Sequence, residues 1–366
     1  MLETKWFTLL QQIHRICNAD ERYPQTKTRL IDTFQSTRQR LTDINSRDHS
    51  DDWIAQEAFT LVVSELLTSG SLDGTTLNEL FDLLMTVKLH RLALILVNSS
   101  ASQWSVGELP LKRALALFQL GERESARQSL QQALALTPDN HLCHFHLGYL
   151  EVWSGEMEQA VAAFNRCLEL APDYAGAHQN LAGCHYQSSE FQLAIDSCQR
   201  AHRLQPGIAA TYITATSACI ALKRFDDADQ WLQRAREFDF STPEFMRLHG
   251  LVAHFQSRHQ QACDSLSQYL QLHPRSYDLM AIRARSLLEL EQWHAVIDDT
   301  QALLKLDPFD EWCLEKLFLA YFNTGQYANA EGAMAELGKL FPAYKLHHQH
   351  LLDQIRQHQA IPVQLK

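Results

Sequence analysis

The sequence predicts an all-α protein in which helical hairpins repeat at a fixed interval and stack as an α-solenoid. Prolines stand on a scale of 34 residues at Pro138, Pro172, Pro206, Pro274, Pro308 and Pro342. Twelve residues before these marks stand Ala126, Ala160, Ala194, Ala228, Ala262 and Ala330. Phe240 replaces one proline and Val296 one alanine. Because two registers agree over seven periods, the chain is predicted to repeat one supersecondary unit.

One period, residues 140–172, shows how this spacing produces a hairpin. Gly148 in the first helix and Ala160 in the second are small where the helices would cross, so the two backbones can approach closely. Gly155 separates the helices. Pro172 ends the second helix, because proline has no N–H to donate and its ring clashes with the preceding turn.

This pattern resembles that of the tetratricopeptide repeat family, W-x2-L-G-x2-Y…A-x3-F…P. The matching residues in 141–174 are Leu147, Gly148, Ala160, Phe164 and Pro172. His144 stands in the Trp slot and Glu151 in the Tyr slot. The resemblance implies a right-handed superhelical α-solenoid of about seven helix-turn-helix repeats, preceded by an N-terminal helical segment.

Four segments are expected along the chain. Residues 1–72 lack the 34-residue spacing but show apolar residues at helical intervals, which favours an N-terminal helical bundle or cap. Residues 73–106 have leucines at repeat positions without the alanine and the proline, which predicts a degenerate helix pair. Residues 107–344 hold the repeats, and residues 345–366 a capping helix and tail, since an array needs a polar end face. The expected repeats are 107–140, 141–174, 175–208, 209–242, 243–276, 277–310 and 311–344.

The turn inside each repeat is marked by glycine in three cases. The glycines are Gly121, Gly155 and Gly325, and the residues that replace glycine elsewhere are Ser189, Lys223, Ser257 and Glu291. After Phe240, the residues Thr242, Pro243 and Glu244 supply an N-cap, a first-turn proline and a first-turn acid. We therefore expect the next helix to begin there.

Composition favours an ordered protein with protein partners. The 366 residues carry a formal net charge of -11, which weighs against nucleic acid, because affinity for phosphate backbones comes from Lys and Arg. The sequence contains no stretch of 18 apolar residues, so no membrane span is predicted. The first residues lack the basic and apolar regions of a secretory signal. A soluble cytoplasmic protein is expected.

Cysteines and histidines are expected to serve packing rather than chemistry. The eight cysteines, which form no C-x-x-C pair, are Cys17, Cys143, Cys167, Cys184, Cys198, Cys219, Cys263 and Cys313, and we expect buried thiols. His144 and His178 share one repeat position, which favours buried rings over a metal site. The segment 347–350 suggests either a polar cap or a weak chelate. No phosphate loop, GxSxG, HExxH or EF-hand motif occurs, so no catalysis, cofactor or metal is expected.

The resemblance implies that defined positions of each first helix line a groove for a partner segment. These positions and their neighbours hold Phe118, Phe145, Tyr149, Trp153, Gln179, Asn180, Tyr186, Arg247, Arg285 and Lys316. Tyr and Trp combine apolar area with a polar tip, a mixture enriched at binding hot spots. The alternative is that the aromatic stripe of Phe145, Tyr149 and Trp153 packs in the core and that the later charges are ordinary solvated surface.

Two functions follow from these observations. The first is a non-catalytic scaffold or adaptor that binds a protein or peptide in the groove. The alternative is a peptide-sensing regulator in which the array controls the N-terminal bundle, a layout similar to that of bacterial peptide-sensing regulators. An enzyme within residues 1–106 is the least favoured possibility, because no set of nucleophile, base and ligands converges there.

Overall fold

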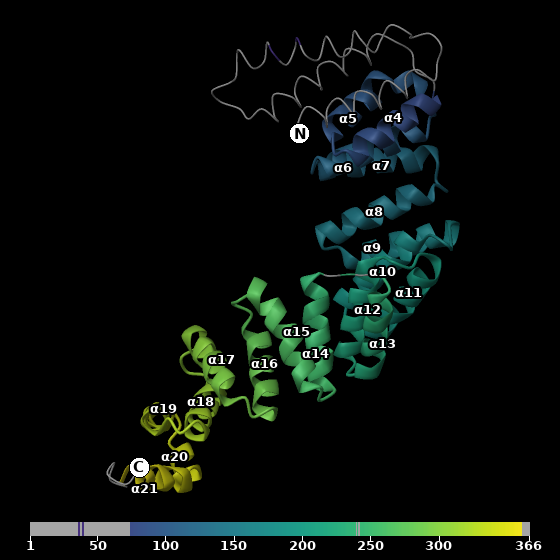
Figure 1. Cartoon of the computed structure of the whole chain (residues 1–366). Helices are drawn as coiled ribbons and strands as arrows, with labels where there is room; N and C mark the ends of the chain where they lie inside the picture. The colour runs from purple at the N-terminus through teal and green to yellow at the C-terminus, as the bar shows by residue number, and fades with distance from the viewer. Residues whose placement is uncertain (1–35, 37–38, 40–73, 239, 241, 361–366) are drawn as a thin grey trace. The chain divides into compact units, whose positions relative to one another are not determined.

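The structure is a computed structural model that describes residues 36, 39, 74–238, 240 and 242–360 (Figure 1). In this part of the chain every regular element is a helix, which confirms the all-α class. The N-terminal bundle expected in residues 1–72 lies outside the described residues, apart from Ser36 and Gln39.

Seven hairpins follow one another in the described residues 108–340, each inside one expected repeat. They are α6 (Glu108–Gln119) with α7 (Arg123–Leu136), α8 (His141–Ser154) with α9 (Met157–Leu170), α10 (Ala175–Gln187) with α11 (Phe191–Leu204), α12 (Ala209–Ala221) with α13 (Phe225–Arg236), α14 (Pro243–Phe255) with α15 (His259–Leu272), α16 (Tyr277–Glu289) with α17 (Trp293–Leu306), and α18 (Glu311–Asn323) with α19 (Tyr327–Leu340). The expected helix-turn-helix fold is confirmed.

Further helices flank these hairpins. Before them come α4 (Gly74–Thr86), α5 (His90–Ser99) and the short 3-10 helix η1 (Ala101–Gln103), and after them α20 (Ala343–His347) and α21 (Gln349–Ala360). The division of the chain into functional segments at residues 72, 106 and 344 stays a prediction.

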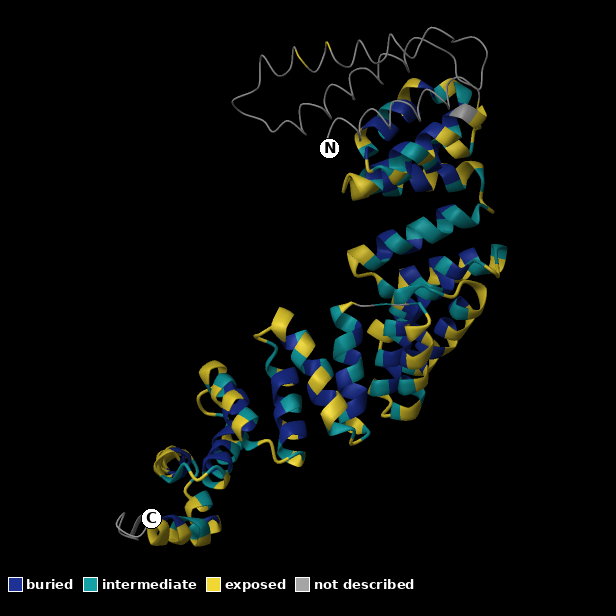
Figure 2. Ribbon diagram, in the orientation of Figure 1, coloured by how far each residue is buried: buried dark blue, intermediate teal, exposed yellow. Residues whose placement is uncertain are grey.

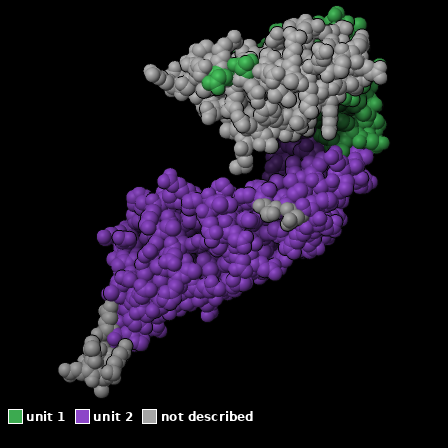
Figure 3. Space-filling view, turned by 45° about the horizontal axis from the view of Figure 1, so that its top comes forward, with its two compact units in different colours: residues 1–177 green, residues 178–366 purple. Residues whose placement is uncertain are grey.

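The chain divides into two compact units, residues 1–177 and 178–366, with the boundary inside α10 (Figure 3). Each unit has its own apolar cores. Buried and exposed residues alternate along the helices, so that each helix has an apolar face and a solvated face (Figure 2).

Small side chains allow the two helices of a hairpin to pack closely. The residue twelve positions before each proline mark is completely buried at Ala126, Ala160, Ala194, Ala228, Ala262, Val296 and Ala330. A Cβ atom added to Gly148 would lie 2.8 Å from the Phe164 ring, and one added to Gly250 would lie 2.5 Å from Leu266. The packing requirement predicted for Gly148 and Ala160 is therefore confirmed.

The turn of every hairpin places one residue at positive φ, whether or not it is glycine. The φ angles are 81° at Gly121, 82° at Gly155, 72° at Gly325, 62° at Ser189, 58° at Lys223, 59° at Ser257 and 54° at Glu291. At Lys223 the amide donates to Ile220 O at 2.9 Å and the next amide donates to Cys219 O at 2.8 Å, which is the hydrogen-bond pattern of a Schellman motif. Lys88, between α4 and α5, has the same conformation with φ 63°.

Lys223→Gly is expected to raise the free energy of unfolding by about 0.5–1 kcal/mol. The left-handed conformation costs a residue with a Cβ about 1–2 kcal/mol, and the greater freedom of glycine in the unfolded chain offsets part of that gain. Urea unfolding followed by circular dichroism measures the change. Gly155→Ala is the reverse control and should lower stability, and a Lys223→Gly chain that unfolds at lower urea than wild type would contradict the argument.

Glu151, which occupies the Tyr slot of the repeat pattern, is buried with 4% of its surface exposed. Arg127 of α7 forms an ion pair with Glu151 Oε1, and its Nη2 donates to Ser154 Oγ at 3.2 Å. A buried carboxylate is tolerated only with such a partner, because it loses its hydration. A departure from the pattern in one repeat is therefore compensated by a residue of the preceding repeat.

Arg127→Leu should lower the free energy of unfolding by about 2–3 kcal/mol, because it leaves Glu151 buried without a countercharge. The double variant Arg127→Leu with Glu151→Tyr should recover most of this loss, since it removes the buried carboxylate together with its partner and restores the Tyr of the repeat pattern. Urea titration measures both. Arg166→Leu, whose ion pairs with Asp139 and Glu169 are exposed, serves as the control and should leave the free energy of unfolding nearly unchanged. A double variant as unstable as the single one would contradict the pairing.

The boundary that lacks a proline is built differently from the others. Helix α13 has 12 residues, whereas the second helices of the other six hairpins have 14. Phe240 stacks on Phe245 at 5.3 Å and lies 5.7 Å from Tyr212, so it fills this boundary with an aromatic ring. Helix α14 begins at Pro243 as expected, and Thr242 is its N-cap residue without a side-chain hydrogen bond.

The capping helix expected within residues 345–366 is divided in the structure, because the chain forms α20 and α21 with a break at His348. His348 is buried, its Nε2 lies 3.0 Å from Glu315 Oε1, and its ring lies 5.4 Å from Phe318. The break turns this imidazole inward onto the last hairpin. Ile355 of α21 is also completely buried in the apolar core there.

Candidate functional site

Residues 1–177 present an exposed aromatic surface built by α6, α7 and α8. Phe118 and Tyr149 meet edge to face with ring centroids 5.4 Å apart. One turn after Tyr149, Trp153 leaves 54% of its surface exposed, and the guanidinium of Arg123 lies 4.9 Å from its ring centroid. We call Phe118, Arg123, Tyr149 and Trp153 the aromatic surface. It offers apolar area, a phenol and a cation to a partner.

Phe145, the first residue of the predicted stripe, packs mainly within its own repeat. Its ring lies 5.9 Å from Phe164 of α9 and 5.0 Å from Tyr174 in the loop that follows. The aromatic stripe is therefore neither wholly core nor wholly surface. Phe145 takes part in the packing of the hairpin, Tyr149 is half-buried, and Trp153 is exposed.

The uncharged polar positions expected in the groove lie on α10 of the second unit. Gln179 and Asn180 are half-buried. Tyr186 is 36% exposed, and its ring lies 5.6 Å from Phe191. These side chains leave part of their polar surface to solvent.

The basic positions expected in the groove already have intramolecular contacts. Arg247 Nε donates to Glu244 at 2.9 Å, and Lys316 donates to Glu315 at 2.7 Å. The guanidinium of Arg285, an exposed side chain, lies 5.1 Å from the ring centroid of Trp312. Arg285 with Trp312 repeats the arginine-on-tryptophan contact of the aromatic surface.

Histidines occupy packing positions rather than a common centre. His178 is buried, while His144 is half-buried with Nε2 3.0 Å from Pro138 O. Burial lowers the pKa of His146 to about 4, so this imidazole is neutral at neutral pH. Among the described residues, no three His, Cys, Asp or Glu side chains are grouped so that they could hold a metal ion.

The seven cysteines of the described part of the chain are free and buried, as expected. Cys17 lies outside the described residues. Burial raises the pKa of Cys143 to about 11, because a thiolate would lose its hydration. Burial, then the charge of Cys219, raises the pKa of Cys198 to about 12. Thiols of this kind are poor nucleophiles at neutral pH.

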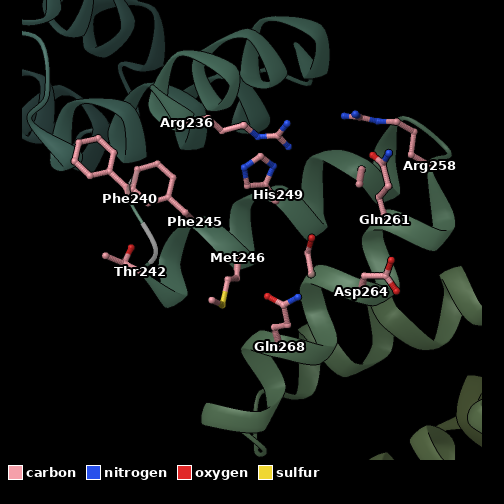
Figure 4. Close-up of a pocket in the computed structure, with 12 residues that line it drawn as sticks. Arg236, Phe240, Thr242, Phe245, Met246, His249, Arg258, Gln261, Asp264 and Gln268 are labelled. Carbon is pink, nitrogen blue, oxygen red and sulfur yellow. The ribbon is translucent and has the colours of Figure 1, made fainter. Parts of the chain in front are cut away.

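A pocket of about 460 Å³ opens in the second unit between the end of α13, α14 and α15 (Figure 4). Phe240, Phe245 and Met246 form its apolar end. Arg236, His249 and Arg258 form its basic part, and Gln261, Asp264, Ser265 and Gln268 of α15 provide polar atoms. We call this the α13–α15 pocket. Its volume lies within the range of small-molecule sites.

The basic groups of the α13–α15 pocket differ in their partners. Arg258 Nη2 donates to Asp229 Oδ1 at 2.7 Å, whereas Arg236 is exposed and has neither an ion pair nor a hydrogen bond in the described residues. Burial, then the charges of Arg236 and Arg258, lowers the pKa of His249, while Asp229 acts in the opposite direction. Within the described residues the Arg236 guanidinium therefore has no partner, and it stands near an imidazole whose pKa is lowered.

Sequence reasoning missed this pocket, although one signal was present. Phe240 marks the boundary where the proline spacing fails, and the pocket lies beside that boundary. Single residues of the pocket, such as Arg236 and His249, follow no motif.

The fold defines a helical-repeat protein with exposed aromatic and basic side chains. Residues 111–175 and 154–207 match the model of the tetratricopeptide repeat. With the 34-residue hairpins described above, the chain is a tetratricopeptide repeat protein. Residues 250–340 also match the model of the bacterial transcriptional activator domain. A comparison with curated proteins finds no match.

Several solved structures share the repeated hairpins at low identity. YrrB, described as a TPR protein with an unusual peptide-binding site, is 16% identical with a TM-score of 0.47, over 52% of this chain and 97% of that one. A tetratricopeptide repeat protein from Parabacteroides merdae is 14% identical with a TM-score of 0.46, over 69% and 99%. MamA from Desulfovibrio magneticus is 16% identical with a TM-score of 0.43, over 47% and 97%.

Within the described residues, none of the helices combines the length and apolar character needed to cross a membrane.

Proposed function

We propose that the chain is a non-catalytic scaffold of the cytoplasm that binds a segment of a partner polypeptide along the first helices of its repeats. The tetratricopeptide repeat fold supports a protein-interaction role in general, because stacked hairpins expose a row of helix faces that a partner chain can follow. Gln179, Asn180, Tyr186, Arg247, Arg285 and Lys316 are proposed contacts on the second unit.

The observation that carries this proposal is the exposure of Trp153. Its indole has more than half of its surface in water although it is a large apolar side chain, and Arg123 and the Phe118–Tyr149 pair support the aromatic surface around it. Binding hot spots are enriched in Trp, Tyr and Arg. Burial of this indole by a partner would recover hydrophobic free energy that the free protein does not gain.

Trp153→Ala combined with Tyr149→Ala should reduce the affinity for the partner at least about tenfold, because hot-spot residues contribute about 2 kcal/mol or more. Affinity capture with quantitative mass spectrometry identifies candidate partners, and calorimetry with the purified partner measures the change. Leu272→Ala, which removes another exposed apolar side chain, on α15, is the matched control. Circular dichroism checks that all variants keep their helicity.

Unchanged affinity of the double alanine variant would refute the aromatic surface as the contact. Equal loss in the double variant and in Leu272→Ala would show a general effect of surface apolar residues and would also refute it.

A peptide-sensing regulator is the second candidate, and the match of residues 250–340 to the bacterial transcriptional activator domain favours it. In this proposal a peptide bound by the repeats changes how residues 1–72 are held. A transcriptional regulator acts on nucleic acid. The net charge of -11 weighs against direct contact of this chain with nucleic acid, so in this proposal a protein partner makes that contact.

Small-angle scattering separates the two candidates. A regulator should change its scattering profile when a bound peptide saturates the chain, because its function requires a second conformation. A scaffold need not change. If the scattering profile of the chain is unchanged when peptide saturates it, the proposal of a regulator is contradicted.

A further inference from the structure

The α13–α15 pocket lies on a different face of α14 from the predicted groove. Met246, His249 and Ala253 line the pocket. Glu244, Arg247 and Leu251 hold the groove positions of the same helix, and a period of 3.6 residues places them on the opposite side. A ligand of the pocket would therefore not compete for the groove positions of α14.

The pocket follows from the irregular boundary before α14. Helix α13 ends at Arg236, two residues short of the length of its equivalents, and Phe240 takes the position of the missing proline. At the position of Met246 in the sixth and seventh hairpins, Met280 and Leu314 are buried, whereas Met246 remains partly exposed. The opening is thus a local property of this boundary.

The polar atoms around the opening point to a ligand with one negative charge. Arg236 extends toward His249 in Figure 4 and has no acceptor of its own in the described residues. Arg258 is neutralised by Asp229, yet its buried Nε also lacks an acceptor. Asp264, which accepts from Gln260 at 2.9 Å, adds a negative charge to the wall, so a dianion would be repelled.

The other end of the opening accepts apolar atoms. Phe240 and Met246 are half-buried and Phe245 is buried beside them (Figure 4). We propose that the α13–α15 pocket binds a carboxylate that has an apolar group next to it, with the carboxylate on Arg236 and His249 and the apolar group on Phe240 and Met246. A short peptide that ends in an apolar residue and a free small acid both have this chemistry.

Three probes distinguish the sources: N-acetyl-leucine, a hexapeptide of alanines ending in a free-acid leucine, and the same hexapeptide with a C-terminal amide. Calorimetry on the full chain should detect the free-acid peptide and not the amide. If N-acetyl-leucine binds as tightly as the free-acid peptide, the ligand is a small acid; if it binds more weakly, the ligand is a peptide end. Equal binding of acid and amide, or no binding of either acid, overturns the proposal.

Arg236→Gln should weaken binding of the acid about tenfold or more, because a charge-assisted hydrogen bond is lost. Arg236 is exposed and has no partner among the described residues, so this variant should keep the fold. Arg200→Gln, an exposed arginine of α11 outside the pocket, is the control and should bind like wild type. Met246→Glu, which places a negative charge at the apolar end, is a second variant and should also weaken binding. Wild-type affinity of Arg236→Gln overturns the assignment, as does tighter binding of inorganic phosphate than of acetate.

Binding should also strengthen as the pH falls from 8 to 6. The bound carboxylate favours the protonated form of His249, whose pKa is otherwise lowered by burial and by Arg236 and Arg258, so ligand and proton bind cooperatively. Asp229 and Asp264 are the acidic groups that face this region. His249→Gln should remove this pH dependence, and a pH dependence that survives in His249→Gln overturns the role of the imidazole.

Discussion

Close approach of the two helices within each hairpin is the constraint on which this structure depends. An isolated amphipathic hairpin cannot bury both of its apolar faces, so each hairpin needs its neighbours, and neighbours can stack regularly only if every hairpin has the same thickness. Completely buried small residues such as Ala160 and Ala194, and the contact of Gly148 with Phe164, hold that thickness constant. The 34-residue interval of the sequence reflects this requirement for hairpins of equal thickness.

Departures from the repeat pattern are compensated by neighbouring residues. Glu151 in the Tyr slot requires Arg127 of the preceding repeat. Phe240 replaces a helix-ending proline and builds an aromatic boundary with Tyr212 and Phe245. Regular positions carry stability, and the irregular ones create the local shapes on which recognition can depend.

The sequence predicted the positions of the helices, but not which side chains of one helical stripe are exposed. Prolines, alanines and turn residues act locally, within one or two helical turns, so hairpin positions followed directly from their spacing. Lys223 and Glu291 also have positive φ, so the turn position keeps its conformation where glycine is replaced. The sequence could not predict that Trp153 is exposed while Phe145 packs in its hairpin. Both residues lie on one stripe of α8, and they differ only in which other elements contact them.

The sequence by itself determined the all-α class, the repeat length and the position of each hairpin, because helix propensity and helix-breaking residues depend on neighbours in the chain. Only the tertiary structure decided that Arg127 neutralises Glu151, that the C-terminal helix breaks at His348 with its imidazole on the last hairpin, and that a shortened α13 leaves a pocket lined by Arg236 and His249. Each of these features arises from contact between residues that are distant in the sequence. Their energies come from burial and charge pairing, which no local pattern encodes.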